Sequence, residues 1–259
     1  MRQLPIPKSL EPFVMSIFYM EDLDTQYHKK LPFYADGFTG VCYTKSEYPF
    51  YQQPRGKQLS DFYLCGQTIE PITLEVQGAY QLLCVRMYPF AVRVLLGVDP
   101  KILNDDCFDL KLVENVDTQP TLDKLNQAKD YLEMVEILPP YFDALLKNAS
   151  INPDHRIKLA INLILNYNGT ISIKEVRERL HVTERTLERH FLKEIGVTPK
   201  QFAKIIQFSS TVKTIKETDY LKLTEISYEN GFADQSHFIR SFKRFTGKTP
   251  REFQKQISA

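Results

Sequence analysis

The feature that most constrains this chain is an internal repeat near its C-terminal end. The segment RHFLKEIGVTPKQF (189–202) recurs in degenerate form 51 positions later as RSFKRFTGKTPREF (240–253). The identical pairs are Arg189 and Arg240, Phe191 and Phe242, Gly196 and Gly247, Thr198 and Thr249, Pro199 and Pro250, and Phe202 and Phe253. A repeat of about this period is typical of solenoids, but two copies cannot form an extended array. We therefore expect one helical unit that is used twice within a C-terminal domain.

Both copies carry the start and stop signals of helices. Ser172 followed by Glu175 is a capping box, Thr183 precedes a helix over 184–195, and Asp234 precedes a helix over 235–246. The sequence also predicts caps at Asn152-Pro153, before a buried face up to Gly169, and at Thr224. A short helix, a tight turn and a second helix form a helix-turn-helix motif. The sequence therefore predicts two such motifs in one domain.

A long helix connects the two motifs. It begins at Thr198-Pro199, runs to about Lys216, and at about 1.5 Å per residue is about 27 Å long. Thr249-Pro250 begins a short final helix in the same way. Because successive major-groove faces of duplex DNA lie roughly 34 Å apart, one chain with this spacing suits two adjacent grooves.

The charge is divided unequally along the chain. Residues 151–259 contain 19 Lys and Arg against 12 Asp and Glu, a net charge of +7, whereas residues 1–150 carry a net charge of −6. A basic C-terminal half fits a polyanionic partner, for which phosphate attraction supplies affinity. The expected partner is double-stranded DNA.

The N-terminal half has the pattern of a β-rich domain. Aromatic and β-branched runs cover 13–20, 38–44, 61–66, 72–76 and 80–87, with Pro and Gly between them. A helix over 90–97 follows, and two amphipathic helices are expected over 121–137, capped by Thr121, and 140–148, separated by Pro139-Pro140. These last helices form either core packing or a dimerisation surface. The predicted class is α+β: a β-rich barrel or sandwich (1–112), a helical linker (113–150) and an all-α domain (151–259).

No secretory signal is recognised at the start of the sequence, and no apolar run approaches the roughly 18 residues of a membrane span. We expect a cytoplasmic protein without membrane contact. Cys42, Cys65, Cys84 and Cys107 form no CxxC motif, and the simplest interpretation is four reduced, mostly buried thiols.

The second copy, GFADQSHFIRSFKRFTGKTPREF, and the first, RTLERHFLKEIGVTPKQF, resemble the AraC/XylS family of bacterial transcription regulators. The resemblance covers about residues 151–256 and implies regulation of transcription without catalysis or a cofactor. It also implies RNA polymerase, a small-molecule effector and a second copy of the chain as further partners.

The resemblance assigns base contacts to Arg185, Glu188, Arg189, Gln235, Ser236, His237 and Arg240. It assigns phosphate contacts to Thr198, Lys243, Lys248 and Thr249. Arginine suits guanine, glutamine suits adenine, and glutamate suits the cytosine amino group. The alternative for each residue is a solvated helix face. The outer faces of the two copies differ, so we expect them to read different half-sites.

Two positions depart from the family pattern. Arg177 stands where the family usually has a small residue, whereas the second copy keeps Ser227. Gln207 stands where the linking helix frequently has an arginine. Both departures fall on the first unit or on the linking helix.

The segments 31–43, 62–76 and 82–98 resemble the cupin-like N-terminal domain of one group of these regulators. A metal-dependent cupin enzyme needs clustered histidine and carboxylate ligands. It is disfavoured because His28 is the single histidine in residues 1–150. An alkyl-transfer DNA repair protein needs a nucleophilic cysteine, and no cysteine here is adjacent to a histidine. A thiol-based sensor and a domain that only dimerises remain as alternatives.

Overall fold

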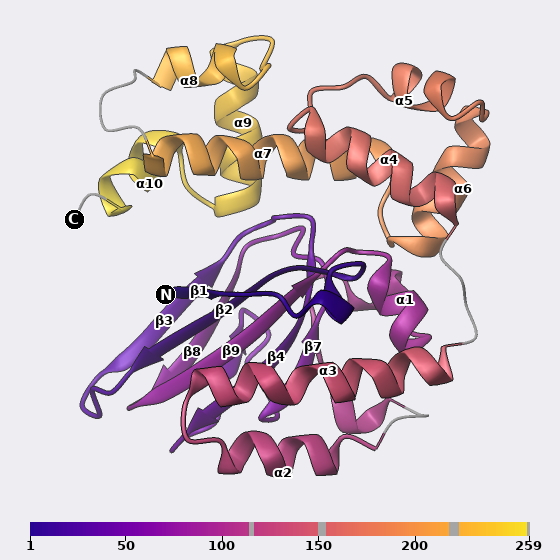
Figure 1. The fold of residues 1–259 in the computed structure, drawn as a ribbon. Helices are drawn as coiled ribbons and strands as arrows, with labels where there is room; N and C mark the ends of the chain where they lie inside the picture. Colours follow the sequence, from indigo (N-terminus) through magenta and orange to yellow (C-terminus); the bar gives the residue numbers. More distant parts are fainter. Residues whose placement is uncertain (114–116, 150–153, 218–222, 258–259) are drawn as a thin grey trace. The chain divides into compact units, whose positions relative to one another are not determined.

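The computed structural model describes residues 1–113, 117–149, 154–217 and 223–257 (Figure 1). The chain divides into two compact units. The first comprises Met1–Phe33, Phe38–Gln67 and Ile72–Pro153, and the second comprises Tyr34–Gly37, Thr68–Pro71 and Asp154–Ala259. A β-rich unit and an all-helical unit confirm the predicted α+β class.

The first unit contains two antiparallel sheets. One has the order β1 (Arg2–Leu4), β2 (Val14–Asp22), β9 (Tyr80–Met87), β4 (Thr39–Ser46), β7 (Phe62–Cys65) and β10 (Cys107–Asp109). The other has the order β3 (His28–Phe33), β8 (Ile72–Gln77), β5 (Tyr51–Gln53) and β6 (Lys57–Gln58). The strands expected from sequence correspond to β2, β4, β7, β8 and β9. The sequence analysis did not identify β1, β3, β5, β6 and β10.

Side chains from both sheets form the core of this unit. The cluster includes Leu74 and Val76 from β8 together with Cys42, Tyr63 and Leu82 from the other sheet. Central strand β4 is buried along Thr39–Thr44 on both faces. Its neighbouring side chains alternate between the faces, so residues next to one another along β4 contact different layers.

Helices cover the other face of the six-stranded sheet. These are α1 (Ala91–Leu96), α2 (Gln119–Gln127) and α3 (Tyr131–Asn148), and Figure 1 shows α3 lying across the strands. The rings of Tyr19 and Tyr131 lie 5.2 Å apart, and the Tyr43 hydroxyl donates to Asn126 Oδ1 at 2.8 Å. Short 3-10 turns occur at Lys8–Leu10, Pro100–Leu103 and Leu110–Leu112. The expected helix over 90–97 is confirmed, and it ends at Gly97 with a φ of 65°.

The predicted break at Pro139-Pro140 is wrong, because both prolines lie inside α3. A proline in a helix interior costs about 3 kcal/mol. Here Leu138, Tyr141 and Phe142 are all buried, so the apolar face of α3 continues past the prolines. Burial of such side chains, at roughly 1.5–3 kcal/mol each, is of the same order as the cost of the two prolines, about 6 kcal/mol, and offsets it.

The observed break instead falls before Asp130, whose carboxylate accepts hydrogen bonds from the N–H groups of Leu132 and Glu133 at the start of α3. Helix α2 begins at Gln119 with Thr118 as its N-cap residue, so the predicted cap Thr121 lies within the helix. An aspartate cap after a short loop is a local signal for a helix start.

The described residues of the second unit form seven helices. They are α4 (His155–Asn166), α5 (Ile173–Arg179), α6 (Glu184–Glu194), α7 (Pro199–Glu217), α8 (Leu223–Glu229), α9 (Gln235–Thr246) and α10 (Pro250–Ile257). Figure 1 shows α7 running between the group α4–α6 and the group α8–α10. Phe208, Phe238, Phe242 and Phe253 belong to one buried cluster around α7. The pairs α5–α6 and α8–α9 are the two predicted helix-turn-helix motifs.

Most of the predicted caps in this unit are confirmed. The side chains of Ser172, Thr183 and Asp234 accept hydrogen bonds from backbone N–H groups at the starts of α5, α6 and α9. The expected cap at Asn152-Pro153 lies outside the described residues, and Asp154 is the N-cap residue of α4. The prediction for Thr224 is wrong, since α8 already begins at Leu223.

Candidate nucleic-acid interface

The two helix-turn-helix motifs share one turn geometry. In the first, Val182 N–H donates to Arg177 O and the φ of His181 is 51°. In the second, Phe232 N–H donates to Ser227 O and the φ of Gly231 is 72°. Both bonds measure 3.0 Å. The first motif therefore makes the same turn although Arg177 replaces a small residue.

The outward face of α6 carries the residues that the sequence analysis selected in the first motif. Arg185, Glu188 and Arg189 are exposed, while Leu187 and Phe191 on the opposite side are buried. Leu192 is 41% exposed on the outward side. The structure thus presents two arginines and one glutamate on one face of α6.

The outward face of α9 differs from that of α6 in composition. Gln235, Ser236 and Arg240 are exposed, and Ile239 is 37% exposed. His237 is half-buried, its N–H donates to Asp234 Oδ1 at 2.7 Å, and its ring lies 5.6 Å from that of Phe232. His237 therefore takes part in the cap and turn of the motif, whereas the other three side chains face solvent.

The two Thr-Pro positions form capping boxes. Thr198 N–H donates to Gln201 Oε1 at 3.0 Å, and Gln201 N–H donates to Thr198 Oγ1 at 3.2 Å. Thr249 and Glu252 repeat the arrangement at 2.7 and 3.3 Å. These bonds satisfy N–H groups at the starts of α7 and α10, so both threonines stabilise the scaffold.

The remaining phosphate candidates are two lysines. Lys243 on α9 is exposed, and Lys248 after α9 is half-buried with its Nζ donating to Gln256 Oε1. Glu252 carries a carboxylate whose pKa lies below its usual value because the N–H and hydroxyl of Thr249 stabilise the charged form. Of the two lysines, Lys243 offers an exposed ammonium group, and it lies on the same helix as Arg240.

Gln207 has a structural role that the sequence analysis missed. Its Nε2 donates to the carbonyl oxygens of Asn230 at 2.9 Å and Gly231 at 3.2 Å. These carbonyls belong to the turn between α8 and α9. Gln207 on α7 therefore holds the turn of the second motif in place. Its partner Asn230 lies 23 positions further along the chain, so no local sequence pattern indicates this contact.

Both motifs meet at the same part of α7. A Cβ atom at Gly169, before α5, would overlap Ala203 O and Gln207 N. A Cβ atom at Gly231 would lie 2.9 Å from Thr170 Cγ2 and 3.6 Å from Gln207 Nε2. The two glycines allow this approach, so the first motif, the second motif and α7 form one contiguous scaffold.

The first motif has an additional polar anchor. His190 Nδ1, on the inner side of α6, lies 2.8 Å from Asp154 Oδ2 at the start of α4. Burial raises the pKa of Asp154. The N–H and guanidinium groups of Arg156 and the neighbouring His190 lower the same pKa by more, so the net pKa lies below the usual value. This carboxylate caps α4 and contacts α6, which orients the outward face of α6.

Two matched helix-turn-helix motifs on one central helix, each with a polar outward face, define a class of DNA-binding domain. Among the described residues, no helix combines the length and apolar composition needed to cross a membrane. Likewise, the described ranges contain no group of three or more His, Cys, Asp and Glu side chains that could hold a metal ion.

Comparisons with known proteins agree with this class. Residues 176–256 match the family described as "Helix-turn-helix domain", and residues 2–109 match a domain of unknown function, DUF6597. The uncharacterized HTH-type transcriptional regulator YtdP of Bacillus subtilis is 26% identical over 177 residues, which are 66% of this chain and 20% of YtdP. The transcriptional activator RhaS of Escherichia fergusonii is 26% identical over 114 residues, 42% of this chain and 41% of RhaS.

Among solved structures, ToxT of Vibrio cholerae matches with a TM-score of 0.54 and 14% identity over 95% of this chain and 100% of that chain. At this identity the match shows a shared two-domain fold. Over residues 176–256 the chain is therefore similar to helix-turn-helix transcription regulators. It spans about a fifth of the length of YtdP, so the comparison with YtdP concerns only part of that protein.

Proposed function

We propose that this protein binds duplex DNA with both helix-turn-helix motifs and regulates transcription. The observation that carries the proposal is the pair of matched turns, which hold α6 and α9 with their polar faces outward on a scaffold centred on α7. Helix α7 has 19 residues and is thus about 28 Å long, comparable with the roughly 34 Å between successive major-groove faces. The net charge of +7 over residues 151–259 supports attraction to phosphates.

Base reading is assigned to the outward faces. In the first motif Arg185 and Arg189 suit guanine, and Glu188 suits the cytosine amino group. In the second, Arg240 suits guanine and Gln235 suits adenine. Ser236 and His237 complete the second set, with His237 restricted by its place beneath the cap.

Phosphate contacts are assigned first to Lys243 and Lys248, because an ammonium group attracts phosphate without regard to sequence. For Thr198 and Thr249, a phosphate contact would compete with the capping boxes that their hydroxyls already form. We therefore rank the two lysines above the two threonines. Because the proposed target is chromosomal DNA, we also propose a cytoplasmic location.

The N-terminal unit is proposed to modulate DNA binding through a small-molecule effector or through dimerisation, and RNA polymerase is the further partner of a transcription activator. Solved ToxT structures include one bound to an unsaturated fatty acid and one bound to a naphthalenyl butenoic acid. A thermal shift of the full chain with a panel of carboxylic acids tests the effector, since a ligand of the native state raises the unfolding temperature. An alkyl-transfer role is disfavoured because Cys42, Cys84 and Cys107 are buried and the half-buried Cys65 is not adjacent to a histidine in the sequence.

The proposal is tested by selecting bound duplexes from a random pool and footprinting the selected site. We expect two protected major-groove segments about one helical turn, roughly 10 base pairs, apart. Arg189→Ala should weaken protection of one segment and Arg240→Ala that of the other. Lys111→Ala, which removes an exposed charge from the first unit, is the matched control and should leave both segments protected. Failure to enrich any sequence would contradict the proposal.

A further inference from the structure

The four cysteines, which lie far apart in sequence, come together on one face of the six-stranded sheet. Cys42 pairs with Cys84 across β4 and β9, and Cys65 pairs with Cys107 across β7 and β10. The Sγ atoms are 3.0 Å apart in the first pair and 2.9 Å apart in the second. Each pair is directly opposed in antiparallel strands, so the two side chains of a pair point to the same side of the sheet.

The two pairs lie next to each other. The Cys42 and Cys65 thiols interact, and these residues lie on the neighbouring strands β4 and β7. Gly40 is the residue opposite Cys65, and a Cβ atom there would lie 3.2 Å from Cys84 Sγ and 3.7 Å from Cys42 Sγ. A glycine at this position therefore leaves space beside the sulfur atoms.

The strand pairing places the two cysteines of each pair within the range that a disulfide spans. Directly opposed residues of antiparallel strands have Cα atoms about 4.5–5.5 Å apart, within the range that a disulfide spans. Two thiolates on a tetrahedral zinc ion with bonds of about 2.3 Å are about 3.8 Å apart. The observed 2.9 and 3.0 Å lie between that separation and the roughly 2.05 Å of a disulfide bond.

The two pairs differ in access to solvent. Cys42, Cys84 and Cys107 are buried, whereas Cys65 is half-buried. The strand segment that carries Cys107 is held by side chains of the hairpin formed by β5 and β6. Lys57 Nζ donates to Cys107 O at 2.6 Å, and Arg55 forms an ion pair of 2.9 Å with Asp106.

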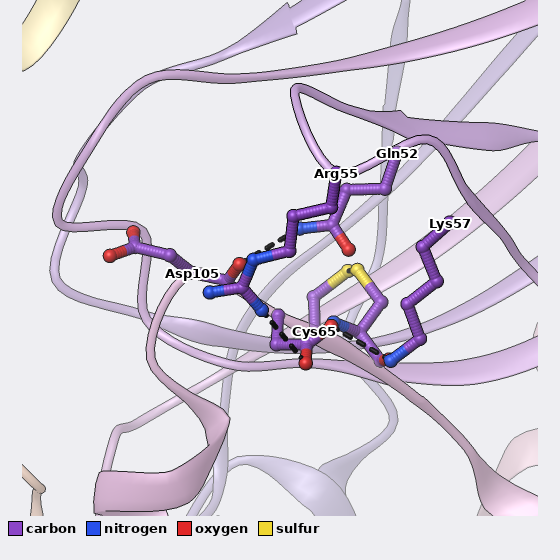
Figure 2. Close-up of polar contacts among 7 residues, drawn as sticks. Gln52, Arg55, Lys57, Cys65 and Asp105 are labelled. Atoms are coloured by element: carbon purple, nitrogen blue, oxygen red, sulfur yellow. Dashed lines mark hydrogen bonds and ion pairs between the residues drawn. The ribbon is translucent and has the colours of Figure 1, made fainter.

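Figure 2 shows this polar cover beside the Cys65 sulfur, with Gln52, Arg55 and Lys57 directed toward the segment at Asp105. Gln52 Nε2 donates to Asp105 O at 2.9 Å. These contacts fix the backbone on the Cys107 side of the pair, and Cys65 is the one of the four cysteines that is not fully buried. The pair that contains Cys65 is therefore the one that an oxidant meets first.

We propose that Cys65 and Cys107 form a reversible dithiol–disulfide site that is oxidised by hydroperoxides, while Cys42 and Cys84 form a protected second pair. Cys65 attacks the hydroperoxide ROOH, which leaves as the alcohol ROH, and Cys65 becomes a sulfenic acid. Cys107 then attacks that sulfur and releases water. Overall the two thiols lose two electrons and two protons as the S–S bond forms. This site does not depend on the proposed DNA binding.

The electrostatics of the pair determine how it reacts. The Cys107 thiol lowers the pKa of Cys65, but the Cys42 thiol and burial raise it by more, and the Cys65 thiol and burial raise the pKa of Cys107. Few thiolates are therefore present near neutral pH, and oxidation is slow but accelerates as the pH rises. Thiols with a high pKa are poor leaving groups, so the disulfide is slow to be reduced once formed.

The test uses the full-length reduced protein with hydrogen peroxide, thiol counting and peptide mapping. We expect loss of two of the four thiols, a linkage that maps to Cys65 and Cys107, and full recovery with dithiothreitol. The initial rate should rise about tenfold per pH unit between pH 7 and pH 8. Cys107→Ser should trap the Cys65 sulfenic acid, which dimedone labels, and Cys84→Ser is the matched control that keeps the linkage.

Wild-type mapping alone decides the matter if a variant fails to fold. A first linkage between Cys42 and Cys84, or between the two pairs, would overturn the assignment. Four thiols that stay reduced in the folded protein, yet react once it is denatured, would overturn it too. So would a stoichiometric metal ion that leaves when the thiols are modified.

Discussion

Replacing Gly231 with alanine should weaken the junction at which the two helix-turn-helix motifs meet. Gly231 has a φ of +72°, and a Cβ atom there would lie 2.9 Å from Thr170 Cγ2. Gly247, at the end of α9, offers a matched comparison. Its φ is +71°, and nothing lies within 4 Å of an added Cβ atom.

The expected magnitudes follow from these two environments. Alanine in the left-handed conformation costs about 1–2 kcal/mol, and both variants share this cost. Gly231→Ala adds a steric overlap that the packed junction must absorb, at about 1–3 kcal/mol. The free energy of unfolding of the second unit should therefore fall by about 1–2 kcal/mol in Gly247→Ala and by about 2–5 kcal/mol in Gly231→Ala.

A second substitution separates the overlap from the backbone strain. Thr170→Ser removes the methyl group that Gly231→Ala would meet but keeps the hydroxyl that donates to Tyr167 O at 2.7 Å. We expect Thr170→Ser to restore about 1 kcal/mol or more in the Gly231→Ala background and nothing in the Gly247→Ala background. Hydrogen exchange of peptides over 223–247 in the full chain measures each difference. Equal destabilisation by the two alanines, or no rescue by serine, would refute the reasoning.

Two further predictions concern the same scaffold. Gln207→Ala removes two hydrogen bonds to carbonyl oxygens of the α8–α9 turn and should lower the stability of that turn by about 1–3 kcal/mol, measured by hydrogen exchange. Acidification should separate the two capping boxes, since Glu252 has a pKa below its usual 4.5 and Gln201 does not titrate. The contribution of Glu252 is complete above about pH 4.5 and is lost as the pH falls through its lower folded-state pKa. The Thr249 amide should thus lose protection in acid while the Thr198 amide keeps it, and Glu252→Gln should remove the difference.

The repeated domain could be predicted from sequence because its signals are local. Ser172, Thr183 and Asp234 start helices through bonds to residues three positions away, so each cap is visible in a short window. The buried phenylalanines of α9 recur at helical spacing for the same reason. Elements that are stabilised by residues close to them in sequence can therefore be predicted from the sequence.

The features that escaped prediction depend on pairing across the fold. The bond from Gln207 to the second turn joins residues 23 positions apart, and the cysteine pairs become neighbours only through strand register. Strands β5, β6 and β10 have two or three residues each, too few for an alternating pattern to show. At Pro139-Pro140 a correct local signal was outweighed by burial of the surrounding face of α3.

The comparison of Arg240→Ala with Lys243→Ala on selected and random duplex DNA tests the central claim most directly. Both residues are exposed on α9, but only Arg240 is assigned to a base. Arg240→Ala should weaken binding to the selected sequence by about 1–3 kcal/mol, roughly 5- to 150-fold, and relax preference at one base pair. Lys243→Ala should weaken both DNAs alike and reduce the dependence on salt. An equal loss on selected and random DNA for Arg240→Ala would contradict sequence reading by α9.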